Sequence, residues 1–205
     1  MILRRGLKLK ICVSGAANMN HCGKGAQKVA LVLGREIAKQ GCMLIEGATT
    51  GFPHWAAKGA KGMGGTVVGF SPAKTEKEHI GSYHLPLDYR DLVVYTGFGY
   101  SGRNLLLTRA ADAVIVGCGR IGTINEFTIA FEDRKPIGVL RGAWETDELF
   151  QDIINKSHRV AGMRNKVIFD DSPSSLVRRL LRVVREEKRK NGLARKTRLL
   201  KVAKR

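Results

Sequence analysis

The sequence has few cysteines, few aromatic residues and no long apolar run. Of its 205 residues, four are cysteine and 6% are aromatic. The cysteines form no Cys-x-x-Cys pair and have no histidines at zinc-ligand spacing, so we expect reduced thiols, no disulfide scaffold and no metal site. No apolar segment reaches the ~18 residues that a transmembrane helix needs, and the first residues lack the pattern of a signal peptide. We therefore expect a cytoplasmic protein without membrane contact.

Acidic residues are also scarce, with 18 against 36 basic ones and a formal net charge of +18. The excess is uneven, because 13 of the basic residues and only two acidic ones lie between Arg178 and Arg205. We predict a single domain over residues 1–190 and a basic C-terminal tail over 191–205. The clustered cations of this tail could bind nucleic-acid phosphates, and the absence of aromatic residues would make such binding nonspecific. The alternative is a solvated extension without a specific partner.

The body of the chain alternates strand-like and helix-like segments, which is typical of an α/β protein with a mostly parallel sheet and helices on both faces. Apolar runs predict strands at 8–15, 42–47, 66–72, 92–97, 112–119, 136–140 and 166–170. Amphipathic spacing and glycine ends predict helices at 26–41, 55–65, 101–111, 121–133, 145–157 and 172–190. Residues 73–91 break the periodicity and predict a long loop of the kind that often binds a ligand or forms a lid.

The first predicted strand ends at Ser14 and Gly15, before a loop and a helix. The spacing is not that of the dinucleotide-binding Gly-x-Gly-x-x-Gly motif. A strand end followed by a helix N-terminus still offers backbone N–H groups to an anion. Anion binding and an ordinary sheet connection remain equal alternatives for this turn.

A second turn, GCGRIGTINEF from Gly117 to Phe127, follows the strand DAVIV. Gly119 and Gly122 allow a ligand to approach the backbone, Thr123 supplies a hydroxyl group, and Glu126 follows one helical turn later. This pattern suits a phosphate with a sugar beside it. A helix cap in which Glu126 is the capping-box partner of Thr123 fits the same spacing.

These segments together resemble a known family. GCGRIGTINEF is similar to the P-G-G-x-G-T-x-x-E signature of the LOG (LONELY GUY) proteins, long called lysine decarboxylase-like, and of the related molybdenum cofactor carrier proteins. SGRNLLLTRAADAVIVGCGRIGT resembles the arginine-bearing helix, strand and phosphate loop of that family, and GATTGFPHWAAKGAKGMGGTVVGFSP resembles its glycine-rich segment. The resemblance covers roughly residues 8–186, in the family's order.

The resemblance implies a Rossmann-like doubly wound fold and a homodimer or higher homo-oligomer. It also implies a phosphoribohydrolase that cleaves the N-glycosidic bond of a nucleoside 5′-monophosphate without a cofactor or metal. The family's catalytic arginine and glutamate fall on Arg103 and Glu126, which suits the chemistry because a carboxylate stabilises positive charge on the ribose. The residues expected to bind the nucleotide or its phosphate are Ser14, Gly15, Gly47, Thr49, Thr50, Gly51, Gly119, Arg120, Gly122 and Thr123.

This chain departs from the family pattern within the phosphate loop. Cys118 stands where the family has proline, and Arg120 where it has its second glycine. Asn104 follows Arg103 in place of lysine. We expect Cys118 to be a small filler residue, since no histidine partner follows from the spacing. Two functions remain open: the phosphoribohydrolase, and a non-catalytic carrier or sensor of a nucleotide or molybdopterin-type ligand.

Overall fold

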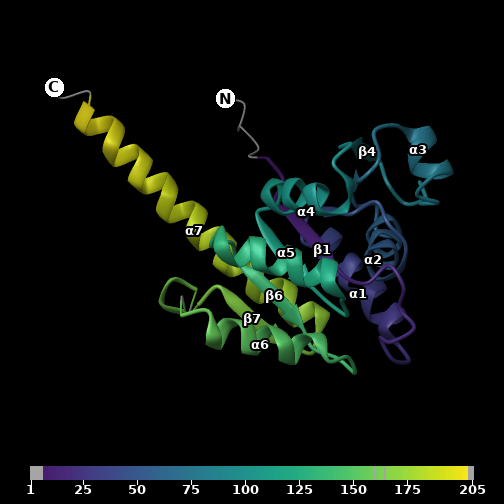
Figure 1. The fold of residues 1–205 in the computed structure, drawn as a ribbon. Helices are drawn as coiled ribbons and strands as arrows, with labels where there is room; N and C mark the ends of the chain where they lie inside the picture. Colours follow the sequence, from purple (N-terminus) through teal and green to yellow (C-terminus); the bar gives the residue numbers. More distant parts are fainter. Residues whose placement is uncertain (1–6, 159, 164, 203–205) are drawn as a thin grey trace.

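The computed structural model describes residues 7–158, 160–163 and 165–202, and it contains a seven-stranded parallel sheet of order β4-β3-β2-β1-β5-β6-β7 (Figure 1). The strands are β1 (Lys10–Ser14), β2 (Met43–Glu46), β3 (Val67–Ser71), β4 (Leu92–Tyr95), β5 (Ala113–Val116), β6 (Ile137–Leu140) and β7 (Val167–Asp170). The helices are α1 (Ala26–Lys39), α2 (Gly51–Lys61), α3 (Glu76–Gly81), α4 (Gly99–Ala110), α5 (Ile121–Glu132), α6 (Thr146–Lys156) and α7 (Pro173–Val202), with a 3-10 turn η1 (Val160–Gly162). The Rossmann-like α/β fold predicted from the sequence is confirmed.

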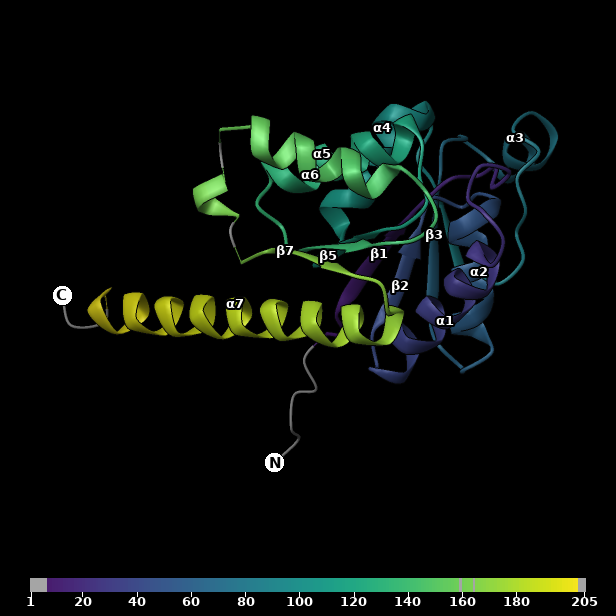
Figure 2. The same cartoon turned by 90° about the horizontal axis from the view of Figure 1, so that it is seen from below.

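The sheet is buried between two helical layers (Figure 2). One apolar core joins the sheet to α1, α2 and α7, and a second joins the other face to α4, α5 and α6. A strand covered on both faces must be apolar at every position, and all four residues of β5 are buried. The near-continuous apolar character of DAVIV therefore reflects its central position in the sheet.

Helices α1 and α2 pack unusually closely because each has a glycine at the contact. A Cβ atom at Gly34 would overlap the carbonyl group of Ala56, and a Cβ atom at Gly59 would overlap that of Leu31. The small side chains bring the two helices together beside β1 and β2. The N-terminal end of α2 lies close to the end of β1, where Phe52 N donates to Ala16 O at 2.9 Å.

Three elements differ from the sequence prediction. Helix α2 begins at Gly51, four residues before the predicted start, because the loop after β2 is short. The expected loop 73–91 contains α3, whose N-cap Thr75 accepts a hydrogen bond from the N–H of Glu78 at 3.2 Å. Helix α7 begins at Pro173 as predicted, but it continues through residues 191–202, where we expected a tail.

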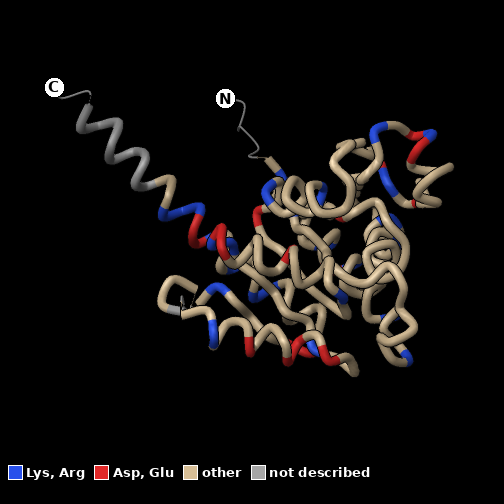
Figure 3. Tube along the Cα trace, in the orientation of Figure 1, with Lys and Arg blue, Asp and Glu red and all other residues tan. Residues whose placement is uncertain are grey.

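The exposed part of α7 carries charges of both signs, which Figure 3 shows side by side where the helix leaves the sheet. Lys188 pairs with Asp112 at 2.8 Å, and Glu187 pairs with Lys166 at 2.5 Å. These pairs attach the helix to the body as far as residue 188. Among the described residues, no helix is both long enough and apolar enough to span a membrane.

Candidate functional site

The candidate site lies at the carboxyl ends of β1 and β5, which are neighbours in the sheet. The loop after β1 leads to α1 on one face, whereas the loop after β5 leads to α5 on the other. Such a reversal opens a crevice above the strand ends, where doubly wound proteins bind ligands. The two loops are joined by a backbone hydrogen bond from Ala16 N to Cys118 O at 2.8 Å. The fold therefore creates a ligand crevice between them.

A cavity of about 440 Å³ occupies this crevice. Nine of the twelve residues singled out from the sequence line it: Ser14, Gly15, Gly47, Thr49, Arg103, Arg120, Gly122, Thr123 and Glu126. The other three lie just outside. Thr50 donates a hydrogen bond to Ala17 O at 3.1 Å, Gly51 begins α2, and Gly119 lines a neighbouring cavity. The predicted residues thus converge, while their roles in binding stay predictions.

Glu126 lies at the bottom of the cavity, bound to the end of β1. Its carboxylate accepts a hydrogen bond from the hydroxyl group of Ser14, and both residues are buried. Burial raises the pKa of Glu126 above its ordinary value, while Arg103 and the Ser14 hydrogen bond act in the opposite direction. Glu126 is therefore a carboxyl group that binds a proton more tightly than an exposed glutamate does.

Arg103, from α4, lies beside Glu126 and is only 6% exposed. One terminal nitrogen donates to Phe70 O at 3.4 Å, whereas Nε is buried and has no hydrogen-bond partner among the described residues. A Cβ atom at position 47 would overlap the guanidinium group, so Gly47 is required for this side chain to enter. A buried cation with an unused donor favours an anionic or polar ligand in the cavity.

A buried ion pair that the sequence analysis missed supports the loop after β2. Arg90 Nε lies 2.7 Å from Glu46 Oε1, and both side chains are fully buried. Arg90 also donates to Thr49 O at 2.8 Å, and Glu46 accepts from Thr49 N at 3.3 Å. A glutamate at the end of the apolar segment CMLIEG was the available signal, since a buried carboxylate requires a partner.

The N-terminus of α5 faces the cavity and receives no side-chain cap from its N-cap residue, Arg120. Its first-turn N–H groups and positive dipole end therefore remain available to an anion. The alternative capping box is wrong, because Thr123 lies inside the helix and Glu126 is bonded to Ser14. Arg120 is exposed and lines this cavity together with the neighbouring one.

The expectation of reduced thiols is wrong for two of the four cysteines. Cys22 and Cys118 form a disulfide with a Cα–Cα distance of 5.6 Å, whereas Cys12 and Cys42 are free and buried. Cys118 is also not a mere filler, since its sulfur lies 3.5 Å from His21 Nε2. The pairing escaped prediction because the two cysteines are 96 residues apart and meet only when β1 and β5 become neighbours.

The mouth of the cavity has an apolar rim formed by Tyr100 and Ile121. Tyr100 is 52% exposed and Ile121 is 80% exposed. This exposure excludes a place for Tyr100 in the apolar core. Arg103 lies under the tyrosine ring, with 5.8 Å between its guanidinium carbon and the ring centre. A planar ligand group is suited to such a rim.

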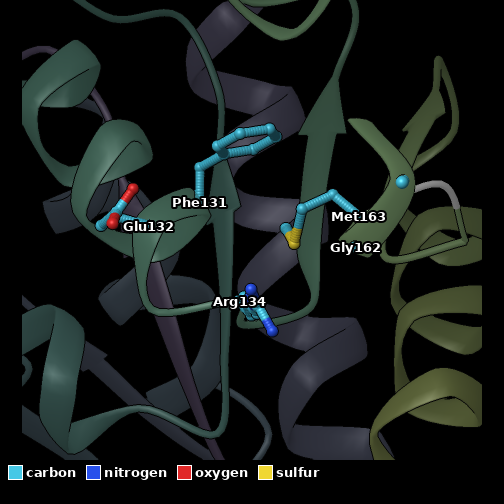
Figure 4. A pocket seen from close by; sticks show the side chains of 6 residues that line it. Phe131, Glu132, Arg134, Gly162 and Met163 are labelled. Atoms are coloured by element: carbon cyan, nitrogen blue, oxygen red, sulfur yellow. The ribbon is translucent and has the colours of Figure 1, made fainter. Parts of the chain in front are cut away.

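Another cavity, of about 380 Å³, lies at the opposite end of α5 (Figure 4). Phe131, Glu132 and Arg134 come from the end of that helix and the turn after it, and Met163 faces them from the segment that contains η1. None of the residues predicted from the sequence lines it. The cavity at the carboxyl ends of β1 and β5 is therefore the better candidate for a functional site.

Comparisons with known proteins agree with this placement. A family model described as the SLOG cluster 4 family matches residues 8–177. An uncharacterised protein of Archaeoglobus fulgidus is 32% identical over 133 residues, which are 65% of this chain and 82% of that protein.

Solved structures with the same fold include proteins that bind the molybdenum cofactor. The molybdenum cofactor binding protein of Rippkaea orientalis is 27% identical, with a TM-score of 0.71 over 87% of this chain and 99% of that one. The molybdenum cofactor carrier protein of Chlamydomonas reinhardtii is 25% identical, with a TM-score of 0.65 over 85% and 99%. The DNA processing protein A of Streptococcus pneumoniae, 15% identical with a TM-score of 0.60 over 83% and 61%, shares the fold alone.

Proposed function

Because this chain belongs to the SLOG cluster 4 family, we propose that it binds a phosphorylated small molecule of the nucleotide or phosphorylated-pterin class and acts as its carrier. The observation that carries this proposal is the uncapped N-terminus of α5, which shares one cavity with Arg103 and Arg120. Backbone N–H groups, a helix dipole and guanidinium groups all favour a phosphate. The ligand's phosphate binds at Gly122 and Thr123, and its planar part lies toward Tyr100.

The carrier role is supported by relatives and by the chemistry of the site. The Rippkaea and Chlamydomonas proteins, which bind or carry the molybdenum cofactor, align over 99% of their lengths. Burial disfavours the negative charge of Glu126 and raises its pKa, although Arg103 and the hydrogen bond from Ser14 act in the opposite direction. A carboxyl group whose negative charge is disfavoured by burial stabilises a cationic transition state less well than an ordinary carboxylate does.

A phosphoribohydrolase is the second candidate, favoured by the position of Glu126 beside Arg103. A carboxyl group with a raised pKa keeps its proton to a higher pH than an ordinary glutamate does, which suits a general acid. Glu126 would then donate its proton to the leaving base, and Arg103 would hold the phosphate or the base. This candidate requires turnover, which a carrier does not show.

The two functions are distinguished by incubating the oxidised protein with a panel of nucleoside 5′-monophosphates and, separately, with isolated molybdenum cofactor. A carrier gives a rise in melting temperature with one of these ligands and releases no free base. A hydrolase releases base and ribose 5-phosphate, and the Glu126→Gln variant abolishes that release while largely keeping binding. If no ligand stabilises the protein and none is cleaved, both candidates are wrong.

A cytoplasmic location remains a proposal. The predicted homo-oligomer is also a proposal, and the surface of the chain supports it. Leu105 and Leu106 of α4 are partly exposed, and so is Ile121 of α5, which lines the cavity. Exposed leucine and isoleucine side chains beside a site favour contact with a second copy of the chain. Sedimentation velocity of the wild type and of a Leu106→Lys variant tests this proposal, because a dimer built on α4 dissociates when a charge enters its interface.

A further inference from the structure

Three side chains with metal-binding atoms meet at the base of the phosphate loop. They are His21 and Cys22, from the loop after β1, and Cys118, from the loop after β5. Their ligand atoms all lie within 4.8 Å of one another. Both cysteines are buried, whereas His21 is exposed and covers them on the solvent side. Two thiols and one imidazole are a ligand set typical of zinc.

The distances within this cluster match those of a tetrahedral zinc site, apart from the disulfide. Zn–S bonds of ~2.3 Å and Zn–N bonds of ~2.0 Å place sulfur and nitrogen ligands ~3.5 Å apart around the metal. His21 Nε2 lies 3.5 Å from the sulfur of Cys118 and 4.0 Å from that of Cys22. The imidazole is therefore already in position relative to Cys118. The two sulfurs must separate to ~3.8 Å, and Cys22 must come closer to His21 by about 0.5 Å.

We propose that, when the Cys22–Cys118 disulfide is reduced, His21, Cys22 and Cys118 bind one Zn²⁺ ion. A dithiol or phosphine reductant supplies two electrons, the S–S bond breaks, and two protons from solvent give two thiols. Zinc then displaces both thiol protons, which are released to solvent, and forms two Zn–S bonds and one Zn–N bond. Since the same sulfur atoms form the disulfide, the oxidised chain does not bind the metal.

The surroundings provide an entry path and a fourth coordination position. A cavity of about 450 Å³, lined by His21, Gly119, Trp144 and Thr146 among others, lies beside the cluster. Water from this cavity completes a three-ligand zinc site. His21 Nε2 lies 3.1 Å from Gly119 O, so metal binding replaces that contact at the phosphate loop. This site goes beyond the proposed carrier function, because it requires no phosphorylated ligand.

The test is a titration of the reduced, full-length protein with Co²⁺ in the absence of oxygen. Thiol assay first verifies that all four cysteines are free. We expect one equivalent of Co²⁺ to produce a sulfur-to-cobalt charge-transfer band and the visible bands of a tetrahedral ion, and Zn²⁺ to remove both. The oxidised protein should show neither band. Reduced protein that shows no such bands would overturn the proposal.

Matched variants identify the ligands. Cys22→Ser and Cys118→Ser should abolish the charge-transfer band of a two-thiolate site, whereas Cys42→Ser, at a buried free cysteine, should keep it. His21→Ala removes one of the three ligands and should weaken Zn²⁺ binding by about tenfold or more. Changes to residues that only support a ligand already weaken metal binding by that much. Because His21 is exposed, this variant leaves the apolar core intact. Metal binding that persists in both serine variants would place the ion elsewhere and contradict the proposal.

Discussion

The hydroxyl group of Ser14 donates a hydrogen bond to the carboxylate of Glu126, although 112 residues separate the two. Ser14 ends β1 and Glu126 lies on α5, so the bond joins the two loops of the candidate site directly beneath the cavity. The surroundings of the Glu126 carboxyl group therefore depend on how both loops pack. The pH dependence of stability should therefore reveal the state of this one carboxyl group.

Glu126→Gln should become more stable relative to the wild type as pH rises. Burial raises the pKa of Glu126 in the folded protein, so the folded state binds the proton more tightly than the unfolded state does. Its contribution to stability is full below the unfolded pKa and is lost as pH rises through the folded pKa. Urea unfolding between pH 4 and 8 measures this difference.

The control for this experiment is Glu148→Gln, which changes an exposed glutamate on α6. Its free energy of unfolding should follow that of the wild type at every pH. If Glu126→Gln also runs parallel to the wild type, Glu126 has no raised pKa, and its proposed use as a hydrogen-bond donor or general acid loses its basis.

Arg90→Met should destabilise the protein by about 3–5 kcal/mol, because it leaves the carboxylate of Glu46 buried without its partner. The double variant Glu46→Gln with Arg90→Met should recover part of this loss, since no buried charge remains. Lys61→Met, in the partly exposed pair with Asp91, should cost under about 1 kcal/mol. Chemical denaturation compares the three variants. Equal effects of Arg90→Met and Lys61→Met would show that burial of the ion pair contributes nothing.

The sequence was sufficient to predict a mostly parallel sheet and most of the residues that converge on this cavity. Each central strand is apolar at nearly every position because both of its faces are covered, as in AVIV of β5. The glycine-rich turns lie at the strand ends, so parallel strands bring Ser14, Gly122 and Glu126 to the same edge. Local pattern and chain order together therefore located the cavity.

The contacts between side chains from distant segments could not be predicted in this way. Arg90 lies in a stretch that has no regular pattern, and it meets Glu46 from 44 residues away. Cys22 and Cys118 meet only because the loops after β1 and β5 lie over neighbouring strands. Periodicity reports which face of an element is buried, but it does not identify partners across the sheet.

Arg120→Gln should weaken binding of the phosphorylated ligand by about tenfold, because a charge-assisted hydrogen bond contributes roughly 1.5–3 kcal/mol. Arg120 is exposed and its side chain has no partner among the described residues, so the stability of the free protein should not change. Calorimetry with the ligand found in the panel measures the effect. Arg35→Gln, on the exposed face of α1, is the control and should bind normally. An unchanged affinity for Arg120→Gln would remove this residue from the site.

Reduction of the Cys22–Cys118 disulfide in a metal-free buffer should lower the stability of the wild type by up to ~4–5 kcal/mol. The bond closes a loop across 96 residues, and the cost of closing such a loop in the unfolded chain is of that size. The melting temperature with and without reductant measures the loss. The double variant Cys22→Ala with Cys118→Ala should be insensitive to reductant. A wild type that is equally insensitive would mean that the bond does not constrain the unfolded chain.

Removal of residues 191–205 should abolish any nonspecific binding to nucleic acid. The deleted segment contains six of the basic residues and no acidic ones. The buried residues of α7, from Leu176 to Val184, precede the deletion, so the melting temperature should be nearly unchanged. Binding of the intact chain to single-stranded DNA should weaken steeply with salt, since phosphate neutralisation releases counterions. If the shortened chain binds as tightly as the intact one, the basic end of α7 is not the contact surface, and the solvated extension is the correct interpretation.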